Sequence, residues 1–531
     1  MLQVEQSVVD LAQCDRQRLL LKVGFDERAD VFEQAFAQLG VVRIDLTGAT
    51  GRVDDQLILA ARDLTRTVAV RLKRVLLGRA MKSDQLSETL LPKWLALPIF
   101  ASDALSSNAY ATQEILLVLS LGGVAFLQWA PLAAALVVFV FFVVVASYRQ
   151  NVHAYPSGGG DYEVVTTNLG QRAGIFVASA LMIDYVMTVA VSIASAVDNL
   201  GSAFPLIHRH NVTVAVAIVL FVTAMNLRGV RESGSAFAVP VYGFMIGVYG
   251  LLGYALVRMW RGDIILAESA NWQIHPEGAF TGAALVFLIA RAFSSGTTAL
   301  TGIEAISNGV PAFRKPKSKN AATTLLLLGL IATSMFSGIT WLAVKTQVHI
   351  TDSNANLIGL PDGATQKTVI AQISQAVFSD FKFGALYVTA MTAVILALAA
   401  NTAFNGFPVL GSVLAKDGFL PKQLHNRGDR LAFSNGIFML AGVATLLLII
   451  YQANVTRLIQ LYILGVFVSF TMSQLGMIRH WTRHLATETD ASARRAMQRS
   501  RIVNAIGFVS TGIVLVVVLL TKFTHGAYLV V

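Results

Sequence analysis

Long apolar runs constrain the fold of this chain more than any other feature. A transmembrane helix needs about 20 mainly apolar residues, and only 14% of this sequence is charged. The chain offers about eleven such runs, at 94–119, 126–147, 173–200, 211–226, 234–257, 281–311, 321–344, 369–402, 433–452, 457–478 and 502–521. The sequence therefore predicts an all-α membrane protein, whose spans we number in this order. The final "THGAYLVV" is apolar again, and we expect a twelfth span to begin there.

Positive charges gather at alternate junctions between the predicted spans. Lys and Arg precede the first span and follow every even-numbered one, as in "RLKRVLLGRAMK" and "FRKPKSK", whereas "SLGGVAFLQ" has no charge. The positive-inside rule then places the N-terminus in the cytoplasm of a multi-pass protein, which we expect in the inner (plasma) membrane. This pattern accounts for the net charge of +10, so the charge gives no support to nucleic acid binding.

The chain divides into two parts by composition. Residues 1–90 are soluble in character, and we expect them to form a cytosolic N-terminal extension, to which the sequence assigns no role. Residues 91–531 contain all the predicted spans. They are predicted to form one transmembrane domain.

The first and sixth spans are interrupted by polar residues at mid-depth, in "SDALSSN" and "SSGTTALTGIEAISNG". Broken helices in matching positions of two halves are typical of transporters built from inverted repeats. The alternative is a local kink, in which serines bond back to the preceding turn. For Asp103 and Glu304 an ion path is favoured, because intramembrane acids are costly and are usually functional. Capping of the second half-helix is an alternative role for Asp103.

The third span carries the clearest spacing in the chain. Asp184, Thr188 and Ser192 recur every four residues, so a carboxylate and two hydroxyls share one helical face. Small hydroxylated residues can also form a packing seam between helices, but an acid at the head of the row favours a binding role. Carboxylate and hydroxyl oxygens are ligands of hard cations, and protein oxygens can replace the hydration shell of potassium.

Other chemistries have weaker support. Two histidine pairs occur, and neither has a third ligand for a transition metal; they are His208 with His210, and His480 with His484. The "GGG" at 158–160 lacks the Lys-Ser/Thr of a phosphate loop and is predicted to be a flexible turn. We expect neither an enzyme nor a bound cofactor.

Several segments resemble known transporters. "PSGGGDYEVV", "TALTGIEAISNGVPAFRKPKSK" and "VLGSVLAKDGFLPKQL" are similar to the amino acid, polyamine and organocation superfamily. "FASDALSSNAYATQEIL", "TGIEAISNGVPAF", "LYILGVFVSFTMSQ" and "TKFTHGAY" resemble bacterial KUP-family potassium importers of the KimA type. The resemblance implies a LeuT-like inverted-repeat fold with broken helices 1 and 6. It also implies a homodimer and proton-coupled potassium import by alternating access.

The resemblance also assigns roles by position. Cation binding falls on Asp184, Tyr185, Thr188, Ser192 and Thr301, with potassium held at Asp184, Thr188 and Thr301. Proton coupling falls on Glu304, and gating or pathway roles fall on Asp103, Tyr110 and Tyr462. Spacing and depth alone had already selected most of these residues.

The sequence therefore favours a secondary active transporter that imports potassium with protons. The alternative on the same fold is an amino acid or polyamine permease. A zwitterion permease needs free backbone N–H groups in a glycine-rich break, whereas the first span has serine and aspartate there. A cationic amine fits the acids better. A third possibility, a sensor that binds its ligand without net transport, has no recognisable sensory domain to support it.

Overall fold

The computed structural model describes residues 90–227, 234–361, 364–425 and 433–522. The predicted N-terminal extension and the predicted start of a twelfth span lie outside the described residues. Helices dominate the described part, and the one sheet is a pair of two-residue antiparallel strands, β1 (Gln273–Ile274) and β2 (Leu357–Ile358). Within these ranges, 8 helices are long and apolar enough to cross a membrane. The prediction of an all-α membrane protein is confirmed.

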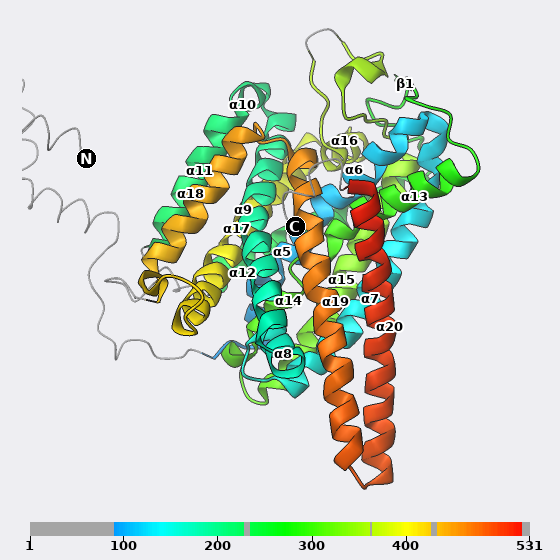
Figure 1. The fold of residues 1–531 in the computed structure, drawn as a ribbon. Helices are drawn as coiled ribbons and strands as arrows, with labels where there is room; N and C mark the ends of the chain where they lie inside the picture. The colour runs from blue at the N-terminus through cyan, green and yellow to red at the C-terminus, as the bar shows by residue number, and fades with distance from the viewer. Residues whose placement is uncertain (1–89, 228–233, 362–363, 426–432, 523–531) are drawn as a thin grey trace, which may run out of the picture. The chain divides into compact units, whose positions relative to one another are not determined.

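The helices follow the predicted spans closely (Figure 1). In chain order they are α5 (Lys93–Ser106) with α6 (Asn108–Leu119), α7 (Ala130–Ala154), α9 (Gln171–Ala203), α11 (Asn211–Leu227), α12 (Gly234–Trp260), α13 (Ala283–Gly296) with α14 (Glu304–Asn308), α15 (Lys317–Lys345), α16 (Val369–Val377), α17 (Lys382–Lys416), α18 (Ser434–Ile450), α19 (Val455–Thr487) and α20 (Ala491–Lys522). Two short helices, α8 (Gly160–Leu169) and α10 (Pro205–Arg209), precede and follow α9.

The prediction for the eighth span was wrong. The run at 369–402 is divided between α16 and α17, and α17 alone continues to Lys416. Arg258 on α12 explains the break, because its Nη1 donates hydrogen bonds to the carbonyls of Ala376 and Val377 at the end of α16. A helix end needs such partners for its free carbonyl groups, and hydropathy along the chain cannot show them.

The three glycines at 158–160 form the predicted turn, and it packs tightly against another span. Gly158 and Gly160 have φ of 82° and 54°, a region that glycine adopts without a steric penalty. A Cβ on Gly160 would lie 1.7 Å from Oδ1 of Asn308 on α14. The turn therefore brings α8 directly against the end of the interrupted sixth span.

Helix α9 lies at the centre of the helical packing. It contacts α17, α19 and α8, and 72% of its most apolar window is buried. At one end of α9 lie α8 and the turn between α19 and α20, and at the other lies α10 (Figure 1). We call these the α8 end and the α10 end. Exposed arginines lie on both sides of the α19–α20 turn at the α8 end, at 479 and 483 on α19 and at 494, 495 and 499 on α20.

Candidate cation site

The sixth span is interrupted beside the first. Helix α13 ends at Gly296, a 3₁₀ turn (η4, Thr297–Leu300) follows, and Thr301 is extended at φ −63° and ψ 146°. Gly302 has φ of 83°, which a residue with a Cβ rarely adopts. A Cβ on Gly302 would lie 2.7 Å from Cβ of Asp103. The first and sixth spans are therefore in close contact immediately before α14 begins.

The first span is much less interrupted. Only Ser107 separates α5 from α6, and its φ of −60° and ψ of −23° remain helical. The hydroxyls of Ser106 and Ser107 donate to the carbonyl oxygen of Asp103, at 2.8 and 3.1 Å. This is the kink with back-bonded serines that was the alternative to an unwound segment. The N-cap of α6 has no side-chain hydrogen bond, so Asp103 does not cap that helix.

Hydroxyl groups connect the spans at this level. Ser107 Oγ lies 2.9 Å from Tyr110 OH and 2.9 Å from Thr301 Oγ1, which joins the first span to the sixth. Thr188 Oγ1 lies 2.9 Å from Tyr462 OH, which joins the third span to the tenth. These oxygens come from the first, third, sixth and tenth spans, and they offer neutral oxygen ligands.

Three buried acids lie among these hydroxyls. Asp103, Asp184 and Glu304 are 4%, 2% and 3% exposed, and each has one carboxyl oxygen without a hydrogen-bond partner. Asp184 interacts electrostatically with Asp103, and Glu304 interacts with both. None of the ion pairs found in the described residues involves them. Buried carboxylates without a compensating charge are very costly, so this arrangement suits a bound cation or protons.

Ser192 and Tyr185 make no hydrogen bond to the other predicted residues, although Tyr185 interacts electrostatically with Glu304 and Asp184. Ser192 is buried one turn beyond Thr188 toward the α10 end, and its hydroxyl has no partner. The hydroxyl of Tyr185 instead accepts a hydrogen bond of 3.1 Å from Asn308 Nδ2, at the end of α14. Its ring packs on Gly406 of α17. The structure therefore places Tyr185 on the α8 side of the acids.

Sequence reasoning assigned no role to two polar residues near the acids. Asn108, the first residue of α6, is fully buried, and both polar atoms of its side chain lack a partner. Asp161 on α8 is 1% exposed and interacts electrostatically with Asp184. The signal for Asp161 was an acid directly after the three glycines, and it was missed because that segment was interpreted as a flexible turn.

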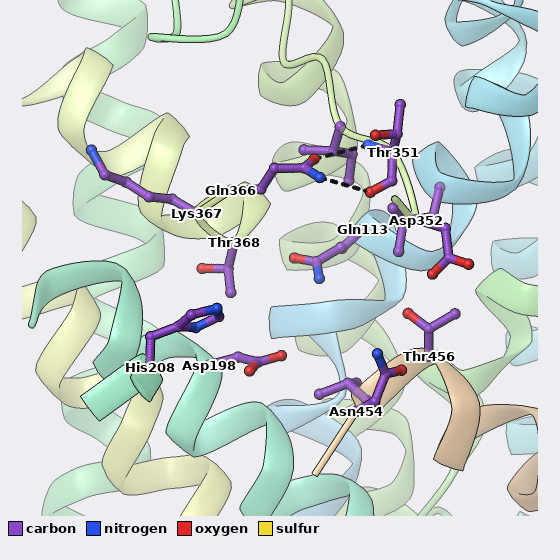
Figure 2. A pocket seen from close by; sticks show the side chains of 13 residues that line it. Gln113, Asp198, His208, Thr351, Asp352, Gln366, Lys367, Thr368, Asn454 and Thr456 are labelled. Carbon is purple, nitrogen blue, oxygen red and sulfur yellow. Dashed lines mark hydrogen bonds between the residues drawn. The ribbon is translucent and has the colours of Figure 1, made fainter. Parts of the chain in front are cut away.

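A separate pocket of about 130 Å³ opens at the α10 end (Figure 2). Its polar side chains come from α6, α9, α10, the start of α19 and the segment before α16, and include Gln113, Asp198, His208, Asp352 and Lys367. Gln366 exchanges two hydrogen bonds of 3.0 Å with the backbone of Thr351 across one wall. Among the described residues, no group of three or more His, Cys, Asp and Glu is placed to hold a metal ion.

Comparisons with known proteins agree on a transporter. The amino acid permease family matches residues 94–526. The potassium transporter KimA of Bacillus subtilis (strain 168) is 38% identical over 453 residues, which cover 85% of this chain and 70% of that protein. The low-affinity putrescine importer PlaP of Escherichia coli (strain K12) is 22% identical over 364 residues, which cover 68% of this chain and 75% of PlaP.

The chain also shares low similarity with solved transporter structures. A manganese transporter of Eremococcus coleocola, in complex with an aromatic bis-isothiourea substituted compound, is 13% identical. The match covers 83% of this chain and 92% of that one, with a TM-score of 0.43.

Proposed function

This chain belongs to the amino acid permease family and to the KimA type within it, and from that premise we propose that it imports potassium ions together with protons. Its all-α membrane fold fits that family, and we expect the helices to follow the LeuT-like inverted-repeat arrangement. Alternating access to the central acids, from the α10 end and then from the α8 end, would move the ions. By the positive-inside rule the α8 end, with its exposed arginines, is cytoplasmic.

One observation carries this proposal. Three buried acids from the first, third and sixth spans interact electrostatically, each keeps an unpartnered carboxyl oxygen, and the hydroxyls of Ser107, Thr188 and Thr301 lie on the same three spans. A dehydrated potassium ion needs several oxygens in place of water. It also removes the cost of the buried negative charge. An anion would be repelled by the same groups.

Glu304 is proposed as the proton-coupling residue. It begins α14, directly after the unwound segment, and interacts electrostatically with Asp184 and Asp103. Burial favours the neutral form of a carboxyl group, and a nearby cation favours the charged form. Proton binding at Glu304 would thus depend on whether potassium occupies the site. We further propose that the protein acts as a homodimer in the plasma membrane, and that it needs no cofactor and catalyses no reaction.

Potassium import is tested first in cells and then with purified protein. We expect expression of the chain to restore growth of a potassium-uptake-deficient bacterium on low-potassium medium. Asp184→Asn keeps the side-chain size but removes the charge that compensates potassium, so we expect it to abolish uptake while the protein still inserts and folds. Near-normal uptake by a folded Asp184→Asn variant would show that the row on α9 serves packing only.

Coupling is tested with Glu304→Gln, which imitates a permanently protonated side chain. Potassium accumulation driven by an imposed pH difference should fail in proteoliposomes. Potassium binding should persist, and it is measured as thermal stabilisation by added potassium. Accumulation against the gradient by this variant would transfer the coupling role to Asp103.

A cationic amine is the second candidate substrate. Three unpaired buried carboxyl groups would also accept an ammonium group, and the similarity to a putrescine importer supports this alternative. Putrescine uptake into the same proteoliposomes, in competition with potassium, separates the two. Growth rescue at low potassium without putrescine uptake would exclude the amine.

A further inference from the structure

A fourth buried acid, Asp161, lies outside the central group. It is the second residue of α8, and its Oδ2 accepts hydrogen bonds from the hydroxyls of Tyr148 on α7 and Ser469 on α19, the latter at 2.7 Å. Its Oδ1 is buried and has no partner. A carboxyl oxygen left without a partner in the interior is costly. A bound proton would remove that charge.

Asp161 lies between the central acids and the α8 end. Helix α8 contacts α9, α14 and α19, and Asp161 interacts electrostatically with both Asp184 and Glu304. Ser469, which binds it, follows Tyr462 on α19 by about two turns in the direction of the α8 end. The carboxyl group is therefore next to the central site and one step closer to the cytoplasmic side.

Further polar side chains continue from Asp161 toward the surface. Asn151 donates to Ser473, at 3.1 Å, and Ser147 donates to Gln474 on the same helix, α19. Asn504 on α20 bonds both Ser147 and the half-exposed Gln150. These groups on α7, α19 and α20 form two hydrogen-bonded sets, Asn151 with Ser473 and Gln474 with Ser147, Asn504 and Gln150, which we together call the seam. Buried polar groups of this kind are where ordered water enters a protein interior.

The groups that face Asp161 carry no compensating positive charge. Tyr148 faces it from α7, Asp184 from α9 and Glu304 from α14, while α19 contributes the hydroxyls of Ser469 and Ser473. Burial raises the pKa of Asp161, and the hydroxyls of Tyr148, Ser469 and Ser473 oppose that rise by stabilising the carboxylate. Burial therefore favours the protonated carboxyl group, and the hydrogen bonds favour the carboxylate, so the surroundings stabilise both forms.

We propose that Asp161 receives the transported proton from the central site and releases it to the cytoplasm. The inference rests on the proposed potassium–proton symport. In the first step the O–H bond of Glu304 breaks and an O–H bond forms on Asp161 Oδ1. In the second step that bond breaks and the proton passes to cytoplasmic water along the seam. Potassium is released to the cytoplasm from the central acids. One proton passes through Asp161 in each transport cycle.

The decisive variant is Asp161→Asn, which keeps the size and polarity of the side chain but cannot hold the transported proton. Two rates are compared in proteoliposomes: net potassium uptake driven by a pH difference, and exchange of potassium for rubidium at equal pH. Exchange requires no net proton movement. We expect net uptake to fall by about a hundredfold or more, the lower end of typical proton-transfer effects, while exchange stays within about twofold.

The outcomes are distinct from those for the proposed function. If the unmodified protein showed neither net uptake nor exchange of potassium, the proposed function would be wrong before Asp161 is tested. Loss of both rates in a folded Asp161→Asn variant would place the acid in the ion path or in packing and overturn the proton role. Unchanged net uptake would overturn it as well.

Ser469→Ala gives a second test that leaves the carboxyl group in place. Removing this hydrogen-bond donor weakens the carboxylate form, so the pKa of Asp161 rises and the proton is released less readily. Net uptake should then reach its half-maximal rate at a higher internal pH than in the unmodified protein, with exchange unaltered. If Asp161→Asn does not fold, the proposal is overturned when Ser469→Ala shows the same dependence of net uptake on internal pH as the unmodified protein.

Discussion

The first and sixth spans have similar polar sequences but different backbones. Both carry hydroxyl residues and an acid at mid-depth, yet α5 and α6 are separated only by the helical Ser107, whereas the sixth span leaves the α-helix over 297–303. The difference is Gly302, whose φ of 83° turns the chain. Serines in the first span bond back to Asp103 instead. Hydroxyl content therefore indicates a polar path, but unwinding also requires a residue that tolerates a left-handed conformation.

The largest effect is expected from Gly302→Ala. The new Cβ would meet Cβ of Asp103 at 2.7 Å and the backbone nitrogen of Ala104 at 2.8 Å, in a conformation that alanine rarely adopts. Separating the two spans would displace Asp103 and Glu304 together. We expect loss of potassium uptake and a lower Tm, measured in proteoliposomes and by thermal unfolding with and without potassium.

Gly250→Ala is the matched control for that prediction. Gly250 lies in α12, and a Cβ there would meet nothing within 4 Å. Alanine improves helix propensity by about 1 kcal/mol, so we expect unchanged uptake and an equal or higher Tm. If Gly302→Ala took up potassium at the same rate as Gly250→Ala, the close contact between the first and sixth spans would not be needed for transport.

An intermediate effect is expected where the spans are joined by hydroxyls. Ser107→Ala and Thr301→Val each remove one side of the 2.9 Å contact between Ser107 Oγ and Thr301 Oγ1. A hydrogen bond of this kind contributes about 1 kcal/mol, roughly fivefold in an equilibrium constant. We expect each variant to raise the apparent KM for potassium by about that factor.

The double variant sharpens this test. If the two hydroxyls act through one shared contact, Ser107→Ala with Thr301→Val should raise KM by less than the product of the single effects. Multiplicative effects would mean that each oxygen contacts the ion independently, and the comparison between the two spans would then rest on Gly302 alone.

The smallest effect is expected from Ser106→Ala. Its hydroxyl donates only to the carbonyl of Asp103 in the preceding turn, a bond that helices do not require. Uptake should stay within about twofold of the unmodified protein, since back-bonding of this kind perturbs a helix only slightly. A large loss of uptake would show that the kink at Ser106 and Ser107 positions Asp103, and the first span would then resemble the sixth in function.

Much of the helical fold was predictable because a lipid environment imposes length and hydropathy on each span. Seven of the expected runs match helices or helix pairs within a few residues, and the helices of three more, α7, α19 and α20, extend well beyond the predicted runs at one end. The eighth did not, because Arg258 ends α16 through contacts more than a hundred residues away in sequence. The turn at 158–160 was predicted, but its packing against Asn308 was not, because Asn308 lies on another span.

The candidate site was predictable where chemistry recurs along one helix or sits at an unusual depth. The four-residue spacing of Asp184 and Thr188 and the mid-depth position of Glu304 identified residues that the structure does bring together. Asp161 was not identified, because an acid beside a glycine turn is ordinary in a sequence. Only the tertiary structure shows that Asp161 is buried between α7, α8 and α19, where it becomes a candidate for proton transfer.

The sequence by itself determined the membrane-spanning class, the order of the spans and the acids that cross the apolar core, because each of these follows from local composition and helical period. Only the tertiary structure decided that Gly302 contacts Asp103, that Ser107 meets Thr301, that Tyr185 turns to Asn308 and that Asp161 lies beside the central acids. These contacts join residues from different helices. They depend on how helices pack, which no periodicity within a single helix specifies.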